Sequence, residues 1–214
     1  MQKADESPKS FLIGICGHYC AGKNYAAKIL EGKGLSSLDL DKLGHQALEI
    51  KKESIIEKFG TTVLKEDGSV DRRLLGKEVF GNKEKLSVLE SIVHPEVNRL
   101  TNIWIAEQNG KPCVINAALL HKSSIFEQLD IVILMTSPLI TRLLRAKKRD
   151  GLTWKEIFRR FSSQKAFNTQ YLRKSADIYK VYNGGILSFS RQSLEKQIDK
   201  ILFLKNVQKP IFQG

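Results

Sequence analysis

The sequence has few cysteines, no long hydrophobic run and no low-complexity tract. Its three cysteines, Cys16, Cys20 and Cys113, are an odd number without a paired framework, which is typical of a reducing compartment. No apolar run approaches the roughly 20 residues of a membrane span. Residues 1–10 are polar and of mixed charge, with no hydrophobic signal core. We therefore expect a cytoplasmic protein that is not held in a membrane.

The sequence also has no motif of the common metal-bound or nucleic-acid-binding modules. Cys16 and Cys20 are spaced closely enough for a metal pair, but no second pair follows, so Cys16 is interpreted as the end of a buried strand and Cys20 as a small loop residue. There is no zinc-finger or RNP-type aromatic pattern. The net charge is nevertheless +12, which indicates an anionic partner. Because the basic residues are dispersed, small polyanions are favoured over nucleic acid.

Apolar segments alternate with amphipathic ones along most of the chain, which predicts an α/β fold with a five-stranded parallel sheet flanked by helices. The 214 residues are enough for one large or two small domains. The pattern predicts strands at 11–16, 35–39, 112–116, 130–135 and 178–182, and helices at 22–31, 138–150, 153–164 and 193–204.

Residues 43–109 differ from the rest because they are charged, helical in pattern and poor in β-branched runs. We interpret them as a helical insertion between the second and third strands. Asp71 has the position of an acidic helix cap, and Lys65-Glu66-Asp67-Gly68 is typical of a turn. His94-Pro95 is expected to end or kink a helix, because proline disfavours helical geometry in the residue before it.

A phosphate-binding loop is predicted between the first strand and the first helix. The segment is Gly17-His18-Tyr19-Cys20-Ala21-Gly22-Lys23-Asn24, and strand, glycine-bounded loop, lysine and helix follow in the order of a P-loop. Glycines allow backbone N–H groups to turn toward an anion, and the helix N-terminus adds about half a positive charge. Lys23 is placed to reach the outer phosphates.

One position of this loop departs from the pattern. A Ser or Thr normally follows the lysine, and its hydroxyl holds Mg²⁺; this chain has Asn24. The amide oxygen of Asn24 is able to ligate Mg²⁺ directly or through water, but less strongly. Asn24 is therefore the candidate metal residue.

Two carboxylates, Asp39 and Asp41, come at the end of the second strand, where sites of α/β proteins are built. One of them is a candidate to accept a proton from an attacking hydroxyl or to help hold the metal. The alternative is that one simply caps the following helix. We expect Asp41 to be the cap and Asp39 to be the base.

A basic cluster follows the fourth strand. Arg142, Arg145 and Arg149 recur on one helix face, and Arg160 and Gln164 lie one turn apart on the next helix. We interpret these helices as a lid that brings guanidinium groups to a transferred phosphoryl group, with Arg149 as the favoured residue; the alternative is a solvated basic face. His94 is expected to serve substrate-domain structure or contact rather than catalysis.

Together these residues resemble the dephospho-coenzyme A kinase family over roughly residues 11–204. The resemblance rests on several motifs in order rather than on the P-loop alone. Beyond that loop, the matching positions are Asp39-Leu40-Asp41, Phe59-Gly60, Asp67-Gly68-Ser69-Val70-Asp71-Arg72, Leu75-Gly76, Val79-Phe80, His94-Pro95, Leu119-Leu120, Arg149 to Thr153, Arg160, Gln164, Ala176-Asp177 and Asn183-Gly184.

The resemblance implies a kinase that transfers the γ-phosphoryl of ATP to the ribose 3′-hydroxyl of dephospho-coenzyme A, with Mg²⁺. It implies one domain in three parts: a core at 11–42, 110–141 and 175–205, a coenzyme A subdomain at 43–109 and a lid at 142–174. Lys23 would stabilise the γ-phosphoryl, Asp39 would activate the hydroxyl and Arg149 would reach the nucleotide. The expected substrate contacts are Asp41, His94 and Arg160. The expected ATP-binding residues are Gly17, His18, Tyr19, Cys20, Ala21, Gly22, Lys23, Asn24 and Tyr25.

The chain departs from this family at two positions near the metal, Asn24 and Asn116. After the third strand the family has Asp-x-Pro-Leu-Leu-Phe-Glu, and here the segment begins with Asn116 and ends with Lys122. Because Lys23, Asp39 and Arg149 are all present, we favour an active variant with altered Mg²⁺ coordination. The alternatives are another small-molecule P-loop kinase and a nucleotide- or nucleic-acid-binding homologue with a decayed site.

Overall fold

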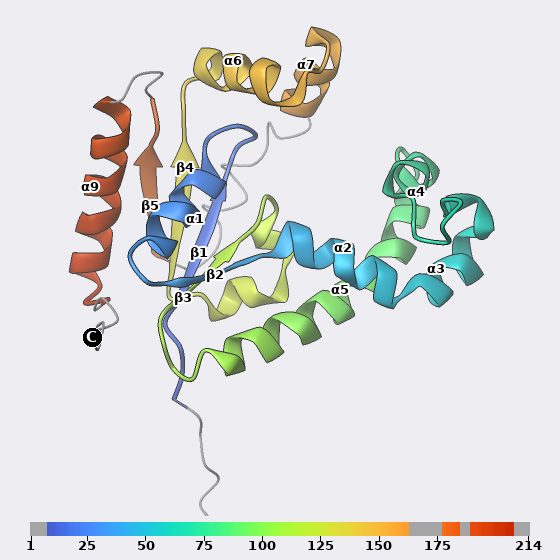
Figure 1. Ribbon diagram of the computed structural model, residues 1–214, viewed down its shortest axis with the longest axis horizontal. Coiled ribbons are helices and arrows are strands. Elements are labelled where there is room, and N and C mark those ends of the chain that lie inside the picture. The colour runs from blue at the N-terminus through green and yellow to red at the C-terminus, as the bar shows by residue number, and fades with distance from the viewer. Residues whose placement is uncertain (1–7, 163–176, 185–188, 208–214) are drawn as a thin grey trace, which may run out of the picture. The chain divides into compact units, whose positions relative to one another are not determined.

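A five-stranded parallel sheet organises the chain, as the sequence predicts (Figure 1). The computed structural model describes residues 8–162, 177–184 and 189–207. The sheet has the order β2-β3-β1-β4-β5. Its strands are β1 (Leu12–Gly17), β2 (Ser36–Asp39), β3 (Cys113–Asn116), β4 (Ile131–Thr136) and β5 (Asp177–Tyr182).

The helices lie close to their predicted positions. The helices outside the 39–104 segment are α1 (Lys23–Glu31), α6 (Leu139–Asp150), α7 (Trp154–Ser162) and α9 (Phe189–Leu204). Of these, α9 begins four residues earlier than residue 193, where it was expected. Gln164 and Ala176, which belong to the predicted lid and to a family motif, lie outside the described residues. No helix in the described parts of the chain is long and apolar enough to cross a membrane.

The central strand β1 is buried along its whole length, because every one of its residues is apolar or small. Ile13 and Ile15 belong to one core cluster with buried residues of α1 and α9, so both helices cover the same face. Gly14 faces the other way, where a Cβ would lie 2.7 Å from Leu120 Cδ2. A strand buried on both faces explains the continuous apolar run.

The register of the strands brings their carboxyl ends to one edge of the sheet. Ile15 of β1 is aligned with Asn116, the last residue of β3. Gly17 is aligned with Met135, and Thr136 is aligned with Tyr182. Loops that leave parallel strands at this edge are where α/β proteins bind ligands.

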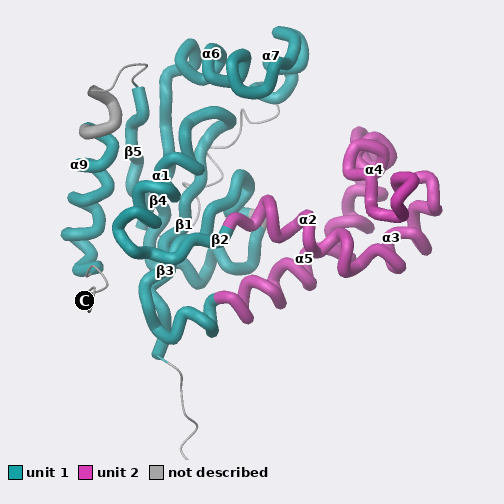
Figure 2. Tube along the Cα trace, viewed as in Figure 1, with its two compact units in different colours: residues 1–38, 105–214 teal, residues 39–104 magenta. Residues whose placement is uncertain are grey.

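The described chain divides into two compact units, 1–38 with 105–214, and 39–104 (Figure 2). The second unit contains α2 (Leu40–Ile50), α3 (Lys52–Phe59), α4 (Arg72–Val79) and most of α5 (Lys83–Glu107). Its helices begin at Leu40 rather than at residue 43. The functional assignment of the core, coenzyme A subdomain and lid stays a prediction.

The second unit has its own core, in which Ile55, Val63, Val70, Leu75 and Val79 are buried together. It is not wholly helical, because Leu64 and Val70 form an antiparallel bridge around the predicted turn. Within that turn the Gly68 N–H donates to the Lys65 carbonyl at 3.0 Å. Asp71 caps α4 as expected, accepting from the N–H groups of Arg73 and Leu74.

His94-Pro95 was expected to end or kink a helix, and the expectation of an end is wrong, because α5 runs through Pro95. A proline inside a helix removes one hydrogen bond and costs about 3 kcal/mol. Tertiary contacts on both sides oppose that cost. Ile92 and Val93 pack against the core of the second unit. After the proline, buried Glu96 pairs with Arg99 at 2.6 Å and with Lys51 at 3.4 Å.

Candidate active site

The predicted phosphate loop is a tight turn between β1 and α1. The Ala21 N–H donates to the His18 carbonyl at 2.9 Å, and Cys20 has a left-handed φ of 59°. α1 then begins with Gly22 as its N-cap. Because glycine has no side chain, it offers no cap to the first-turn N–H groups, which are the groups that bind anions at a helix N-terminus.

Gly17 and Gly22 are required by close contacts in this loop. A Cβ on Gly17 would lie 2.7 Å from Met135 Cβ, and one on Gly22 would lie 2.3 Å from Asn183 Nδ2. Gly22 also has a φ of 102°, which side chains rarely tolerate. A larger residue at position 17 would require β4 to move at Met135, and one at position 22 would displace the Asn183 side chain.

Asn183 fixes this loop from the end of β5, a role that the sequence analysis missed. Its buried side chain donates to the Ala21 carbonyl at 3.0 Å and accepts from Arg145 Nη2 at 3.1 Å. Its own N–H donates to the Thr136 carbonyl at 2.8 Å. The only sequence signal was an Asn-Gly pair after the last strand, which is equally typical of an ordinary turn.

The two unusual asparagines, Asn24 and Asn116, contact each other. Asn116 Nδ2 donates to Asn24 Oδ1 at 3.1 Å, and Lys23 Nζ donates to the same oxygen at 3.2 Å. Asn116 is only 3% exposed, and its Oδ1 atom has no hydrogen-bond partner among the described residues. The two asparagines that depart from the family pattern are distant in sequence, but they form one neutral amide pair beside Lys23.

The described residues contain no group of three or more His, Cys, Asp and Glu side chains that could hold a metal ion. Two amide oxygens, those of Asn24 and Asn116, belong to the contacting asparagine pair at the start of α1. Such neutral oxygens suit a hard cation like Mg²⁺, but they supply no charge to attract it. The donor set therefore fits a metal whose charge is balanced mainly by phosphate.

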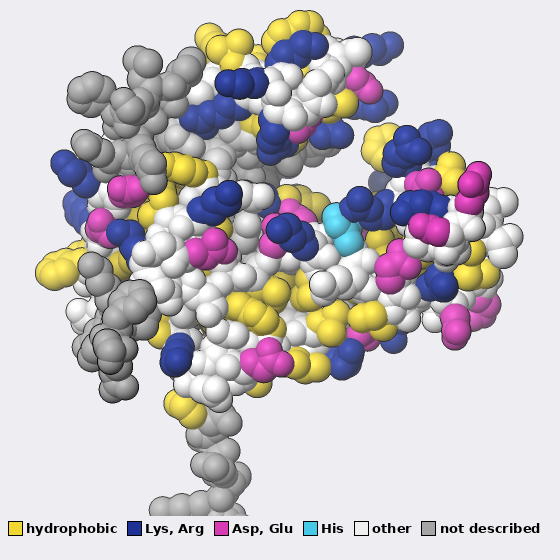
Figure 3. All heavy atoms as spheres, in the orientation of Figure 1, with side chains coloured by type: hydrophobic (Ala, Val, Ile, Leu, Met, Phe, Trp, Pro, Cys, Tyr) yellow, Lys and Arg dark blue, Asp and Glu magenta, His cyan; other side chains and the backbone are white. Residues whose placement is uncertain are grey.

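Four arginines surround the phosphate loop. Arg142, Arg145, Arg149 and Arg160 all lie near enough to Cys20 to lower its pKa, but burial dominates and raises the pKa of this thiol overall. Cys20 therefore stays neutral at neutral pH and adds no negative charge beside these arginines. Figure 3 shows Lys and Arg side chains gathered over α6 and α7.

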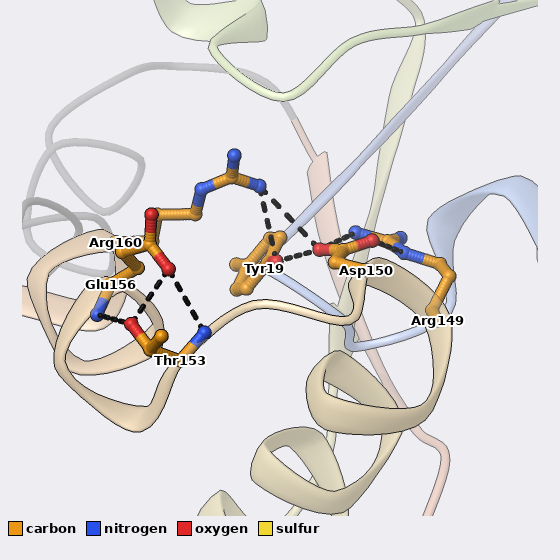
Figure 4. A network of polar contacts seen from close by, with 6 residues as sticks. All are labelled: Tyr19, Arg149, Asp150, Thr153, Glu156 and Arg160. Carbon is orange, nitrogen blue, oxygen red and sulfur yellow. Dashed lines mark hydrogen bonds and ion pairs between the residues drawn. The ribbon is translucent and has the colours of Figure 1, made fainter.

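Helices α6 and α7 bring two of these arginines to the loop. Gly151 ends α6 with a left-handed φ of 63°. The predicted capping box then starts α7, with Thr153 Oγ1 donating to Glu156 Oε2 at 2.6 Å. Arg149 pairs with Asp150 at 2.7 Å, and Arg160 Nη1 donates to the Tyr19 hydroxyl at 3.2 Å (Figure 4).

In the second unit, Asp39 rather than Asp41 caps α2. Asp39 Oδ1 accepts from the N–H groups of Asp41 and Lys42 at 3.0 and 3.2 Å. The expectation that Asp41 is the cap is therefore wrong. An Asx cap needs its acceptor two or three residues before the N–H groups that it binds, and a helix that starts at Leu40 gives this position to Asp39.

His45 and Arg72 lie beside these aspartates. From the sequence, Arg72 was named only as part of a family motif, and His45 was not named. Arg72 Nη1 lies 2.7 Å from His45 Nδ1. Burial, followed by the charge of Arg72, lowers the pKa of His45 against the opposing effects of Asp41 and Asp39. His45 is thus neutral at pH 7. Its signal in the sequence was the four-residue spacing from Asp41, which puts both on one helix face.

His94 is exposed on α5. Its role as a substrate contact stays a prediction. The roles assigned to Lys23, Asp39, Asp41, Arg149 and Arg160 also stay predictions.

Comparison with known proteins decides the family. The sequence profile described as dephospho-CoA kinase matches residues 11–187. The chain belongs to the dephospho-CoA kinase family. It is accordingly an ATP-dependent kinase, and the family predicted from the sequence motifs is confirmed.

Relatives with the same name match almost the whole chain. The dephospho-CoA kinase of Treponema pallidum is 32% identical over 206 residues, covering 92% of this chain and 96% of that protein. That of Treponema denticola is 30% identical, covering 93% and 94%. The similarity therefore includes the helical second unit as well as the phosphate loop.

Solved structures agree with this relationship. A crystal structure of a Thermus thermophilus protein has a TM-score of 0.74 and 30% identity, covering 91% of this chain and 97% of that one. Dephospho-CoA kinase from Campylobacter jejuni has a TM-score of 0.61 and 25% identity, covering 90% and 98%. Both the dephospho-CoA kinase family and its fold thus extend over the chain.

Proposed function

We propose that this protein transfers the γ-phosphoryl group of ATP to the ribose 3′-hydroxyl of dephospho-CoA, giving CoA and ADP. The observation that carries the proposal is the convergence of four arginines and Lys23 on the phosphate loop of a dephospho-CoA kinase family member. Phosphoryl transfer needs positioning and positive charge more than covalent chemistry from the protein. We further propose a cytoplasmic location, which the three free cysteines support.

The first unit would bind ATP. Residues 17–25 would hold its phosphates at the start of α1, through loop N–H groups other than those of Ala21 and Tyr25, which bond within the loop. Lys23 would meet the γ-phosphoryl. Arg149 would approach the same group from the lid. Its present partner, Asp150, is a carboxylate, so a phosphate would be a chemically similar partner.

The second unit would supply the base. Both capping bonds of α2 use one oxygen of Asp39, Oδ1, so the other oxygen takes no part in the cap and is assigned to the attacking hydroxyl. Asp41, His94 and Arg160 would contact the substrates. His45 and Arg72 lie next to the aspartates and extend the proposed acceptor site.

Magnesium would arrive as Mg-ATP. Asn24 and Asn116 would hold it through neutral amide oxygens, directly or through water, while the phosphates supply the negative charge. When bound, the metal would neutralise charge on the transferred phosphoryl group. The buried, unpartnered Oδ1 of Asn116 supports this assignment.

A hydroxyl at position 24 or a carboxylate at position 116 is expected to strengthen the metal site. We expect Asn24→Ser to keep the rate or to lower the Mg²⁺ requirement, because it restores the usual ligand. We expect Asn116→Asp to lower the Mg²⁺ concentration for half-maximal rate by roughly threefold or more, because it adds charge beside the ion. Binding of Mn²⁺ without nucleotide, followed by electron paramagnetic resonance, should rise in Asn116→Asp.

Asn206→Asp is the matched control, because it adds the same charge at an exposed position of the same unit. Complete loss of activity in Asn24→Ser would contradict a simple ligand replacement and would give Asn24 a role of its own. An unchanged metal requirement in both variants would remove the pair from the metal site.

The identity of the phosphoryl acceptor is tested with a panel of candidate acceptors. Purified protein with Mg-ATP is given dephospho-CoA, adenosine, other nucleosides and sugars, and ADP release is followed by a coupled assay. We expect dephospho-CoA to be preferred by a large factor. Phosphorylation of a nucleoside or a sugar without any turnover of dephospho-CoA would favour a different small-molecule kinase.

A further inference from the structure

Tyr19 of the phosphate loop contacts residues of both α6 and α7 (Figure 4). Its hydroxyl donates to Asp150 Oδ2 and accepts from Arg160 Nη1, the latter at 3.2 Å. The edge of its ring packs against Phe161 with a centroid distance of 5.5 Å. One side chain therefore connects the loop to both α6 and α7.

The ring of Tyr19 also holds two cations. The guanidinium carbons of Arg149 and Arg160 lie 5.2 and 5.6 Å from the ring centroid, which is within the range of a cation–π interaction. The Asp150 carboxylate forms ion pairs with the same two arginines, at 2.7 Å from Arg149 Nε and 3.5 Å from Arg160 Nη1. Ring, hydroxyl and carboxylate form one set of contacts that fixes both guanidinium groups.

Such fixing matters because both arginines are exposed. Their side chains are 59% and 53% exposed, and an exposed arginine otherwise samples many rotamers. Ordering it when a ligand binds lowers affinity, and holding it in place beforehand avoids that cost. A tyrosine with its ring and hydroxyl both in use is well suited to this task.

We propose that Tyr19 is a positioning residue that sets Arg149 and Arg160 beside the phosphate loop for the phosphates of ATP. The proposal rests on the proposed function, because it takes the nucleotide as the ligand of the arginines. Tyr19 itself acts through them: its hydroxyl orients Arg160 and Asp150, and its ring orients both guanidinium groups. The chemistry that this arrangement recognises is a polyphosphate lying along the loop.

The test separates ring from hydroxyl and uses ATP binding as well as turnover. Tyr19→Phe keeps the ring and loses the hydroxyl contacts; Tyr19→Leu loses both. We expect the Kd for ATP, measured by calorimetry without acceptor, to rise roughly fivefold in Tyr19→Phe. We expect roughly a further tenfold rise in Tyr19→Leu. KM for dephospho-CoA should change much less than KM for ATP in both variants.

A combination with Arg149→Met distinguishes positioning from simple packing. If Tyr19 acts through Arg149, Tyr19→Leu will have a smaller effect on ATP affinity in the Arg149→Met background than in the wild type. Equal effects in both backgrounds, or a fall in melting temperature with unchanged ATP affinity, would overturn the proposal. Tyr182→Phe, at an exposed tyrosine of β5, is the matched control and should leave the Kd for ATP unchanged.

The same experiment keeps this proposal apart from the proposed function. If the wild type binds ATP but does not phosphorylate dephospho-CoA, the proposed function fails while the ATP affinities still decide the role of Tyr19. If the wild type turns over normally and the Tyr19 variants bind ATP as well as it does, only the role of Tyr19 is lost.

Discussion

Lys23→Met is expected to lower kcat by at least roughly 100-fold while the protein stays folded. Lys23 Nζ lies 3.2 Å from Asn24 Oδ1 at the start of α1, beside the loop that would hold the phosphates. Its charge would stabilise the transferred phosphoryl group, and methionine keeps most of its length and apolar contacts without that charge. The measurement is steady-state turnover of dephospho-CoA with saturating Mg-ATP.

Lys28→Met is the control for this change, because Lys28 is an exposed lysine in the last turn of the same helix. It removes the same charge from the chain at a distance from the loop and should leave kcat unchanged. A Lys23→Met variant with a normal kcat would mean that the lysine has no part in phosphoryl transfer. An equal loss in both variants would point to general electrostatics instead.

Asp39→Asn is expected to lower kcat by roughly 10²- to 10⁴-fold, the range for removing a general base. The structure makes this variant more informative than alanine. Asp39 caps α2 through Oδ1, and asparagine caps a helix as well as aspartate does. The substitution therefore removes the carboxylate charge and keeps the cap, so a loss of rate reports on chemistry. Pre-steady-state turnover measures the rate of the chemical step, and thermal unfolding checks that the helix cap is retained.

Asp71→Asn is the matched control in the same unit. Asp71 caps α4 with the same geometry, accepting from the N–H groups two and three residues later. If capping alone mattered, both variants would behave alike. A normal kcat in Asp39→Asn would remove Asp39 as the base and leave it with a structural role only.

Much of the fold could be predicted because its signals are local. The run at β1 is apolar throughout, since the strand is buried on both faces. The capping box at Thr153 and Glu156 and the cap at Asp71 depend on residues two or three positions apart. Such short-range patterns determine local structure directly, and the structure confirms each of them.

The features that sequence reasoning missed depend on contacts between distant segments. Asn183 reaches the loop across 162 residues, and Asn116 reaches Asn24 across 92. Neither pairing has a local signature. The two asparagines could be recognised as departures from a pattern, but their hydrogen bond required the register that aligns the end of β3 with β1.

Two predictions from local sequence rules failed: that proline ends a helix, and that Asp41 is the N-cap of α2. α5 continues through Pro95 because packing at Val93 and the ion pairs of Glu96 lie on either side of it. Asp39 and Asp41 are both acceptable N-caps by composition, so the choice depended on where α2 begins. A boundary error of three residues, from 40 to 43, was enough to select the wrong aspartate.

Phosphorylation of dephospho-CoA by this chain is measured by mass spectrometry of the product after purified protein is incubated with Mg-ATP and dephospho-CoA, with Lys23→Met as the inactive control. We expect stoichiometric CoA and ADP from the wild type, with fragments that carry the new phosphate on the 3′ position of the ribose. Recovery of unchanged dephospho-CoA from a protein that binds ATP would contradict this expectation.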